Sequence, residues 1–164
     1  MKLPDPLMSG ILIDPYVYQP QAKTCIDVLN PRGKSKYKTA CDLHFYLPSL
    51  KGAECVAGLV SLKDGTLSIR TGFVNDGVSG GGADAFSAIL AWVIHDALFV
   101  LKNEHGKRAG FSYWAANRIY RKVRRAQGTN RLWAWGQWSI LTALGWVPRV
   151  RLIFRKDKLQ EVAR

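Results

Sequence analysis

The sequence predicts an α+β fold in which a β-rich half precedes three helices and a final strand. Residues 1–71 contain short alternating apolar runs between turn signals, and a glycine-rich segment follows. From residue 84 onward the apolar residues recur at helical spacing. A chain of 164 residues has about the length of one domain. We therefore expect a single domain over 1–164, with a β-rich half at 1–71, a loop at 72–83, a helical half at 84–145 and a terminal strand and tail at 146–164.

The strands of the first half are predicted from alternation and from the turns that separate them. Residues 30–33 (NPRG) form a strong turn signal, and the lysines of 34–38 alternate after it as on an exposed strand. Residues 63–65 (KDG) predict a hairpin turn. The expected strands cover 43–47, 56–62 and 66–70.

The helices of the second half are predicted from capping residues and from their apolar stripes. Asp84, Ser112 and Asn130 can each cap the start of a helix, and Gly128 suits the end of the second one. The expected helices cover 84–101, 112–128 and 130–144, and a strand follows at 147–154. The second helix has a basic side, which consists of Arg118, Arg121, Lys122, Arg124 and Arg125.

Composition excludes several classes of protein and leaves one anomaly. Apolar residues make up 48% and charged residues 22%, which excludes disordered, collagen-like and disulfide-dense chains. The net charge of +12 lies entirely in residues 102–164, where fifteen basic residues face three acidic ones. Such a half indicates nucleic acid, a phospholipid surface, an acidic protein partner, or simply a solvated basic face.

Three cysteines, Cys25, Cys41 and Cys55, form no CxxC pattern, and their odd number leaves at least one unpaired. We expect reduced thiols in a protein that is made in a cytoplasm, since the first residues lack the apolar stretch of a signal peptide.

The uncharged run 132–147 is shorter than a membrane span, and the apolar run 85–101 carries His95 and Asp96. We expect no transmembrane span.

Two adjacent features could carry chemistry: the glycine-rich loop and the pair His95–Asp96. Four glycines within residues 77–82 would let the backbone approach an ion or an anion, although a linker is an equal alternative. A carboxylate inside an apolar helix is costly unless it is paired or bound to a metal. The two side chains therefore form either a satisfied structural pair or the two flanks of one site.

These two features resemble a phage and prophage family of unknown function, numbered 1353. Its pattern is Gly-Phe-Val-Thr-Asp-Gly-Ala-Ser, then a helix with His-Asp-x-Leu-Tyr, and here residues 72–80 read GFVNDGVSG and residues 95–99 read HDALF. The likeness spans residues 67–125. It departs from the pattern at Asn75, Gly80, Phe99 and Asn117, the last of which stands where the family usually has Asp. The resemblance implies a phage or prophage gene.

The same residues are similar, more distantly, to secreted-type phospholipase A2. That family has a glycine-rich calcium loop, a helix with His-Asp, and an antiparallel helix with a second Asp. The resemblance implies His95 as the base and Asn117 as its orienting partner. It implies a Ca²⁺ site formed by the carboxylate of Asp96 and the carbonyls of Asn75, Gly77 and Ser79. Asn117 in place of Asp argues for a degenerate site, because an amide partner can favour the wrong histidine tautomer.

The apolar third helix contains Trp133, Trp135 and Trp138. So apolar a helix is expected to bury its tryptophans in a core. Trp133 and Trp135, however, lie about 200° apart around the helix and cannot both face one core. One side is therefore expected to contact a partner: a protein or a second copy before a lipid surface, and a lipid surface before nucleic acid.

We expect a phage-encoded accessory or structural protein, associated with the tail or head–tail region of a virion, with a degenerate phospholipase-like site. The alternative is a calcium-dependent ester hydrolase that acts on phospholipid at the bacterial envelope, where the basic half would contact anionic lipid. A third possibility is a nucleic-acid binder that uses the basic side of the second helix, whose affinity would fall steeply with salt.

Overall fold

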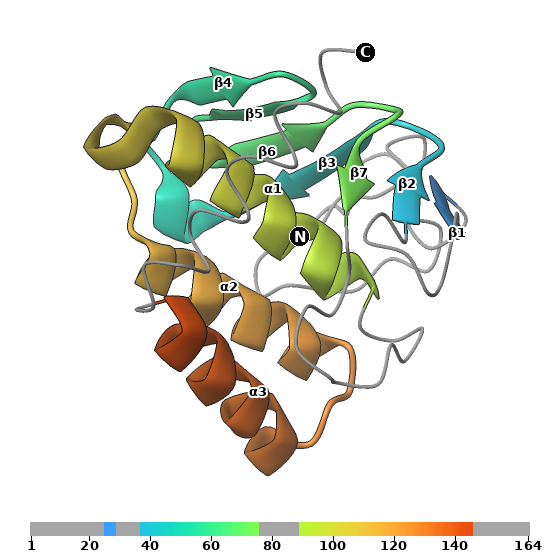
Figure 1. Cartoon of the computed structure of the whole chain (residues 1–164), viewed down its shortest axis with the longest axis vertical. Helices are drawn as coiled ribbons and strands as arrows, with labels where there is room; N and C mark the ends of the chain where they lie inside the picture. Colours follow the sequence, from blue (N-terminus) through green and yellow to red (C-terminus); the bar gives the residue numbers. More distant parts are fainter. Residues whose placement is uncertain (1–24, 29–36, 76–88, 146–164) are drawn as a thin grey trace, which may run out of the picture.

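A computed structural model describes residues 25–28, 37–75 and 89–145, and it has the predicted α+β architecture. Strands precede three helices, and the helices lie in successive layers below the larger sheet (Figure 1). The following expected features lie outside the described residues: the turn at 30–33, the first residues of the helix expected from Asp84, the strand at 147–154, and Gly77 and Ser79.

The larger sheet is antiparallel and has the order β3-β6-β5-β4. It contains β3 (Leu43–Tyr46), β4 (Cys55–Ala57), β5 (Val60–Lys63) and β6 (Thr66–Ile69). Alternate residues such as Leu43 and Phe45 are fully buried, because one face of the sheet packs on a helix. The predicted hairpin turn is confirmed: Asp64 and Gly65 both have positive φ, as a tight two-residue turn requires.

The strand expected over 56–62 is wrong as a single element. It is divided between β4 and β5, which pair with each other in antiparallel register. Gly58 adopts a φ of 55° and reverses the chain there. Alternating apolar residues continue through the turn, so the pattern alone did not reveal the break.

A smaller sheet has the order β1-β2-β7 and consists of β1 (Ile26–Val28), β2 (Tyr37–Thr39) and β7 (Val74–Asn75). Cys25 and Cys41 form a disulfide beside it, while Cys55 is free and buried. The expectation of three reduced thiols is therefore wrong. The spacing of the cysteines did not predict this pairing. Cys25 and Cys41 are sixteen residues apart in the sequence, and the antiparallel pairing of β1 with β2 brings them together.

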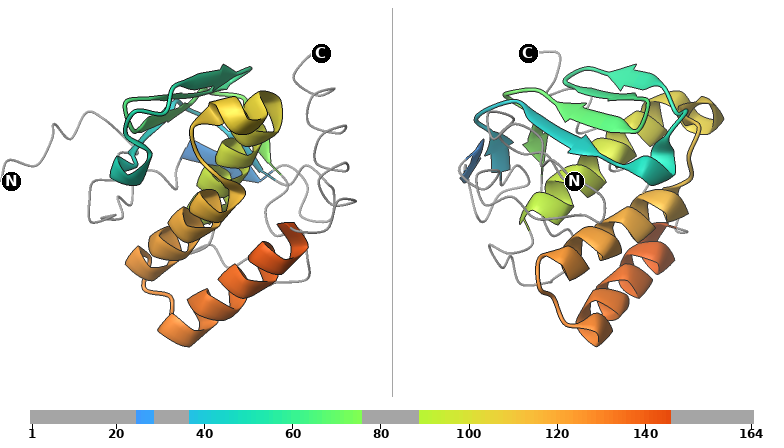
Figure 2. Two further views of the ribbon diagram at one scale, coloured as in Figure 1. Left: turned by 90° about the vertical axis from the view of Figure 1, so that its left-hand side faces the viewer. Right: turned by 180° about the vertical axis from the view of Figure 1, so that it is seen from behind.

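Helix α1 (Ile89–His105) lies between the larger sheet and the second helix (Figure 2). Every residue from Ile89 to Leu98 is buried, so this helix has no solvent face there. It extends beyond the expected end at residue 101, and the short 3-10 helix η4 (Gly106–Ala109) occupies most of the expected polar connection.

Helices α2 (Tyr113–Ala126) and α3 (Arg131–Gly145) form the outer layers. The predicted caps are confirmed: the Ser112 hydroxyl accepts from Ala115 N at 3.1 Å, and Asn130 Oδ1 accepts from Leu132 N at 2.9 Å. Gly128 follows α2 with a φ of 83°. Among the described residues, no helix combines the length and the hydropathy needed to cross a bilayer.

Candidate functional site

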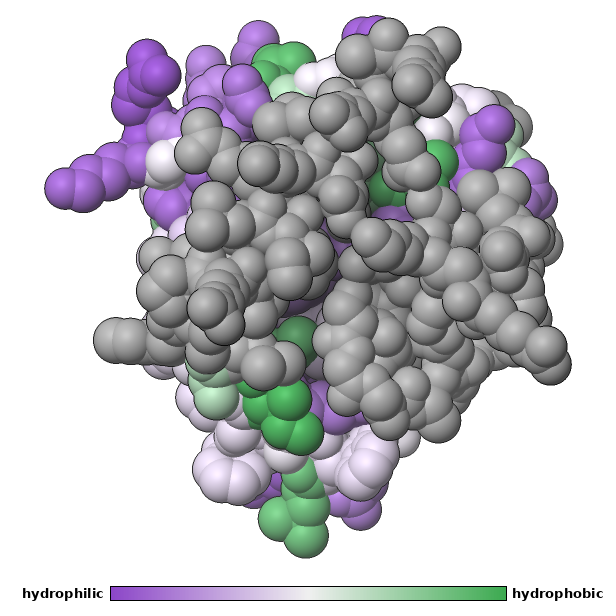
Figure 3. Space-filling view, in the orientation of Figure 1, coloured by the Kyte–Doolittle hydropathy of each residue, from purple (hydrophilic) through white to green (hydrophobic). Residues whose placement is uncertain are grey.

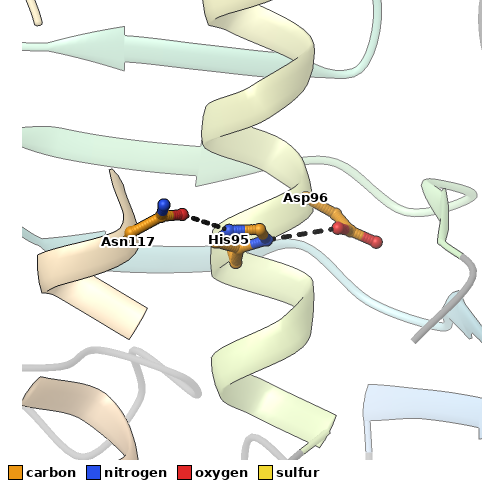
Figure 4. A network of polar contacts seen from close by, with 3 residues as sticks. All are labelled: His95, Asp96 and Asn117. Carbon is orange, nitrogen blue, oxygen red and sulfur yellow. Dashed lines mark hydrogen bonds and ion pairs between the residues drawn. The ribbon is translucent and has the colours of Figure 1, made fainter. Parts of the chain in front are cut away.

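The candidate site is a buried polar cluster between α1 and α2. His95 and Asp96 come from α1, and Asn117 comes from the facing side of α2. The imidazole lies between the other two side chains (Figure 4). His95 Nε2 is 2.8 Å from Asn117 Oδ1, and His95 Nδ1 is 3.5 Å from Asp96 Oδ1. The structure thus brings together the three residues that the phospholipase resemblance selects from the helices.

Thr142 of α3 contacts the Asn117 amide. The amide nitrogen donates to Thr142 Oγ1 at 3.3 Å, and Asn117 Oδ1 faces the imidazole. An amide oxygen can only accept, so in this network the proton lies on His95 Nε2. The neutral ring then has its lone pair at Nδ1.

Aromatic rings surround His95. The centre of the Phe99 ring lies 4.2 Å from the centre of the imidazole, and the centres of the Tyr120 and Trp92 rings lie 5.6 and 5.8 Å from it. His95 is only 4% exposed and Asp96 only 3%. The cluster is consequently held in one geometry, and in this structure its polar atoms lie almost entirely below the surface.

The chemistry open to this cluster is proton uptake at His95 Nδ1. A proton taken up there would lie beside the Asp96 carboxylate, whose Oδ1 is 3.5 Å from Nδ1. Asn117 can hold the ring by its hydrogen bond but cannot compensate a positive charge, as an aspartate at the same position would. The site therefore has a general base that is oriented on one side by an uncharged partner.

The expected Ca²⁺ ligands are only partly described. Asn75 is buried on β7, which packs beside α1, and Asp96 lies on α1 itself. Gly77 and Ser79 fall outside the described residues. Calcium takes six to eight oxygen ligands, and within the described ranges no three His, Cys, Asp or Glu side chains gather as a metal site.

A second polar group joins α2 to α3. The Tyr120 hydroxyl and Arg124 Nε both donate to Gln137 Oε1, at 3.3 and 3.2 Å. Burial raises the pKa of the Tyr120 hydroxyl and lowers the pKa of the Arg124 guanidinium. Arg124 is only 3% exposed, so its assignment to the anionic-partner surface is wrong. It lies one turn after Tyr120 on the buried side of α2.

The other basic residues of α2 do face outward. Arg118, Lys122 and Arg125 are exposed, and Arg121 is partly exposed. The guanidinium of Arg118 lies 4.7 Å from the centre of the Trp114 ring, and that of Arg121 lies 5.0 Å from the Trp138 ring. These pairs fix two cations on the surface between α2 and α3.

The expectation that the tryptophans of the third helix lie first in a core is wrong for two of them. Trp133 and Trp135 are both more than half exposed, whereas Trp138 is half-buried. The side of α3 toward α2 contains the fully buried Ala134 and two polar residues, Gln137 and Thr142, which hydrogen-bond to α2. The side of α3 that faces away from α2 is therefore the more apolar one.

Sequence reasoning missed Thr142 and Gln137, which hold the two polar groups from α3. Both are uncharged residues in an apolar helix, at positions 137 and 142. Their spacing of five residues gave no sign that they face the same neighbour, because the contact depends on how α3 packs on α2. A polar residue in so apolar a helix was the available signal.

The chain matches no protein-family model, and comparison with curated proteins and with solved structures also found no match. The likeness to the phage family numbered 1353 and to phospholipase A2 therefore stays a prediction from the motifs.

Proposed function

We propose that this chain is a phage-encoded accessory or structural protein, associated with the tail or head–tail region of a virion, that contains a degenerate phospholipase-like site. The phage context rests on the resemblance of residues 72–80 and 95–99 to the family numbered 1353. The degenerate character rests on one structural observation: the base His95 is buried and is held by an amide, Asn117, in place of a carboxylate.

Burial supports a binding or structural role over turnover. A general base must lie within hydrogen-bond reach of the proton that it removes, directly or through one water. At 4% exposure, His95 meets that condition only after its surroundings move. Packed between Phe99 and Tyr120, its ring instead joins α1 to α2, and Asn117 and Thr142 extend the link to α3.

Particles purified by density gradient from a host that produces the phage test this proposal. We expect the chain to be present at a fixed ratio to the major capsid protein and to stay there after a high-salt wash. A host protein of similar net charge, followed through the same gradient, controls for adsorption. Recovery of the chain only in the soluble fraction of the lysate would contradict a place in the virion.

A second candidate is a calcium-dependent ester hydrolase that acts on phospholipid. The hydrogen bonds that connect Thr142, Asn117 and His95 favour it. With Nε2 bonded to Asn117, the lone pair of the neutral ring is at Nδ1, where it could take a proton from water once the surroundings of His95 move. A Ca²⁺ ion, when bound, would polarise the ester carbonyl. The hydroxide formed from that water would attack the ester carbonyl, and His95 would give the proton held at Nδ1 to the leaving alkoxide as its bond to the carbonyl breaks.

Release of fatty acid from phosphatidylglycerol vesicles in millimolar Ca²⁺ separates the two candidates. Under the first proposal, the wild type releases no more fatty acid than His95→Gln. Under the second, His95→Gln lowers the rate about 10²–10⁴-fold, while His105→Gln, at a histidine outside the cluster, leaves it unchanged. Asn117→Asp should raise a real hydrolytic rate, since it restores a carboxylate beside the imidazolium.

A further inference from the structure

We propose that the outer face of α3, formed by Leu132, Trp133, Trp135 and Ile140, binds the surface of an anionic phospholipid membrane. This inference uses no residue of the His95 cluster and is independent of the proposed function. It rests on the exposure of this face, on the placement of its tryptophans, and on the cations that border it.

The outer face of α3 is apolar and exposed. Leu132 is 79% exposed and Ile140 58%, and both tryptophans are more than half exposed. Residues 132–145 contain no charged side chain. Figure 3 shows green, apolar side chains among paler and purple ones at the lower end of the molecule, where α3 lies in Figure 1. An apolar face of this kind on an outer helix marks a surface for interaction.

The tryptophans flank this face on both sides. At about 100° per residue, Trp133 and Trp135 lie about 200° apart on the side of the helix toward α2 and roughly 160° apart on the other side. Leu132 and Ile140 lie on this second arc, which faces away from α2. A helix that lies in a membrane interface has this pattern: aliphatic side chains enter the acyl region, and indole rings lie at the level of the headgroups.

Cations border the face. Trp138 lies one turn after Trp135, and the Arg121 guanidinium lies over the Trp138 ring. The Arg118–Trp114 pair is adjacent, since the centres of the Trp114 and Trp138 rings are 6.4 Å apart. Between residues 105 and 145 the chain has eight Lys and Arg residues and no Asp or Glu. Apolar surface beside these cations complements an anionic bilayer, which supplies both an acyl region and negative headgroups.

A nucleic acid fits the same surface less well. Arg118 and Arg121 cover one face of the Trp114 and Trp138 rings, which leaves those faces closed to bases. Trp133 and Trp135 lie on opposite flanks of α3 and cannot form one stacking track. The side chains of Leu132 and Ile140 have no charge, polar group or ring with which to bind a nucleic acid, whereas they can enter the acyl region of a bilayer.

Flotation of the full-length protein with vesicles, in EDTA, tests the proposal. We expect binding to vesicles that contain phosphatidylglycerol at least about tenfold tighter than to phosphatidylcholine alone. Ile140→Asp should weaken binding about tenfold, because it places a charge in the apolar region. Val56→Asp is the matched control: Val56 is 65% exposed but lies on β4, so its variant should bind like the wild type.

A second pair of variants separates specific docking from general charge. Arg118→Glu with Arg121→Glu should weaken binding about tenfold or more. Lys51→Glu with Lys63→Glu changes the net charge equally on exposed residues of the β half and should weaken it far less. Bromine-labelled acyl chains should quench tryptophan fluorescence, and Trp133→Phe with Trp135→Phe should remove most of that quenching.

Three results would overturn the proposal. The first is vesicle binding that Ile140→Asp leaves intact and that shows no quenching, since this is adsorption by charge alone. The second is absence of vesicle binding with tight binding to an oligonucleotide. The third is self-association through α3 that Ile140→Asp abolishes while vesicles are not bound. His95→Gln should bind vesicles like the wild type, which keeps this test separate from that of the His95 site.

Discussion

Asn117 joins three helices through one buried amide. Its nitrogen donates to Thr142 of α3, and its oxygen lies 2.8 Å from His95 Nε2 of α1. Because a threonine hydroxyl can both donate and accept, the Thr142 contact links the helices without choosing between the two orientations of the amide. With Oδ1 toward the ring, as in this structure, the proton lies on His95 Nε2.

Asp42 gives the clearest prediction of pH dependence. Its carboxylate accepts from Thr71 N at 2.7 Å and from Thr71 Oγ1 at 2.9 Å, and these bonds hold the pKa of Asp42 below its ordinary value of 3.8. A lowered pKa in the folded state contributes stability that is present above pH 3.8 and is lost as the pH falls through the folded pKa.

Urea unfolding of the wild type and of Asp42→Asn, from neutral pH to about pH 2.5, measures this contribution. We expect the wild type to lose its advantage over the variant as the pH falls below 4, because protonation removes the charge that Thr71 stabilises. A constant difference between the two proteins across this range would contradict the assignment.

At this scale, sequence patterns found the polar residues within apolar helices but not their partners. His95 and Asp96 stand out because a charged or titratable pair interrupts an apolar run. Asn117 entered through the family resemblance. The prediction that Arg124 lies on the exposed basic side of α2 was wrong, because Arg124 follows Tyr120 by one turn and lies on the buried side. At the edge of an apolar stripe, periodicity alone does not distinguish a buried cation from an exposed one.

Helices were easier to predict than strands. Ser112, Gly128 and Asn130 act through local chemistry, so their caps could be predicted from the residues alone. The small sheet could not. β1, β2 and β7 contain two or three residues each, too few for alternation to be visible, and they depend on pairing across the chain.

The disulfide between Cys25 and Cys41 should stabilise this small sheet. It closes a loop of sixteen residues, so Cys25→Ser with Cys41→Ser should lower the free energy of unfolding by about 3 kcal/mol. Wild-type protein in reductant should resemble this variant in urea titrations. Thiol titration supplies the control: the unfolded, unreduced protein should show one thiol, Cys55, and the reduced protein three.

Across the whole molecule, the elements are stacked as sheet, α1, α2 and α3 (Figures 1 and 2). The polar clusters lie between the helical layers, and the exposed tryptophans lie on the last one. A surface on α3 can therefore bind a partner without disturbing the apolar core between the sheet and α1. The uneven charge of the sequence follows the same order, since residues 105–145 form the basic outer layers.

The burial of α1 on every side from Ile89 to Leu98 has a consequence for synthesis on the ribosome. The chain emerges from its N-terminus, so β3 to β6 are complete at Ile69 before α1 begins at Ile89. Until α1 has left the exit tunnel, this helix cannot cover the apolar face of the nascent sheet. We expect a fragment that ends between these points to be prone to aggregation, because its apolar surface stays exposed.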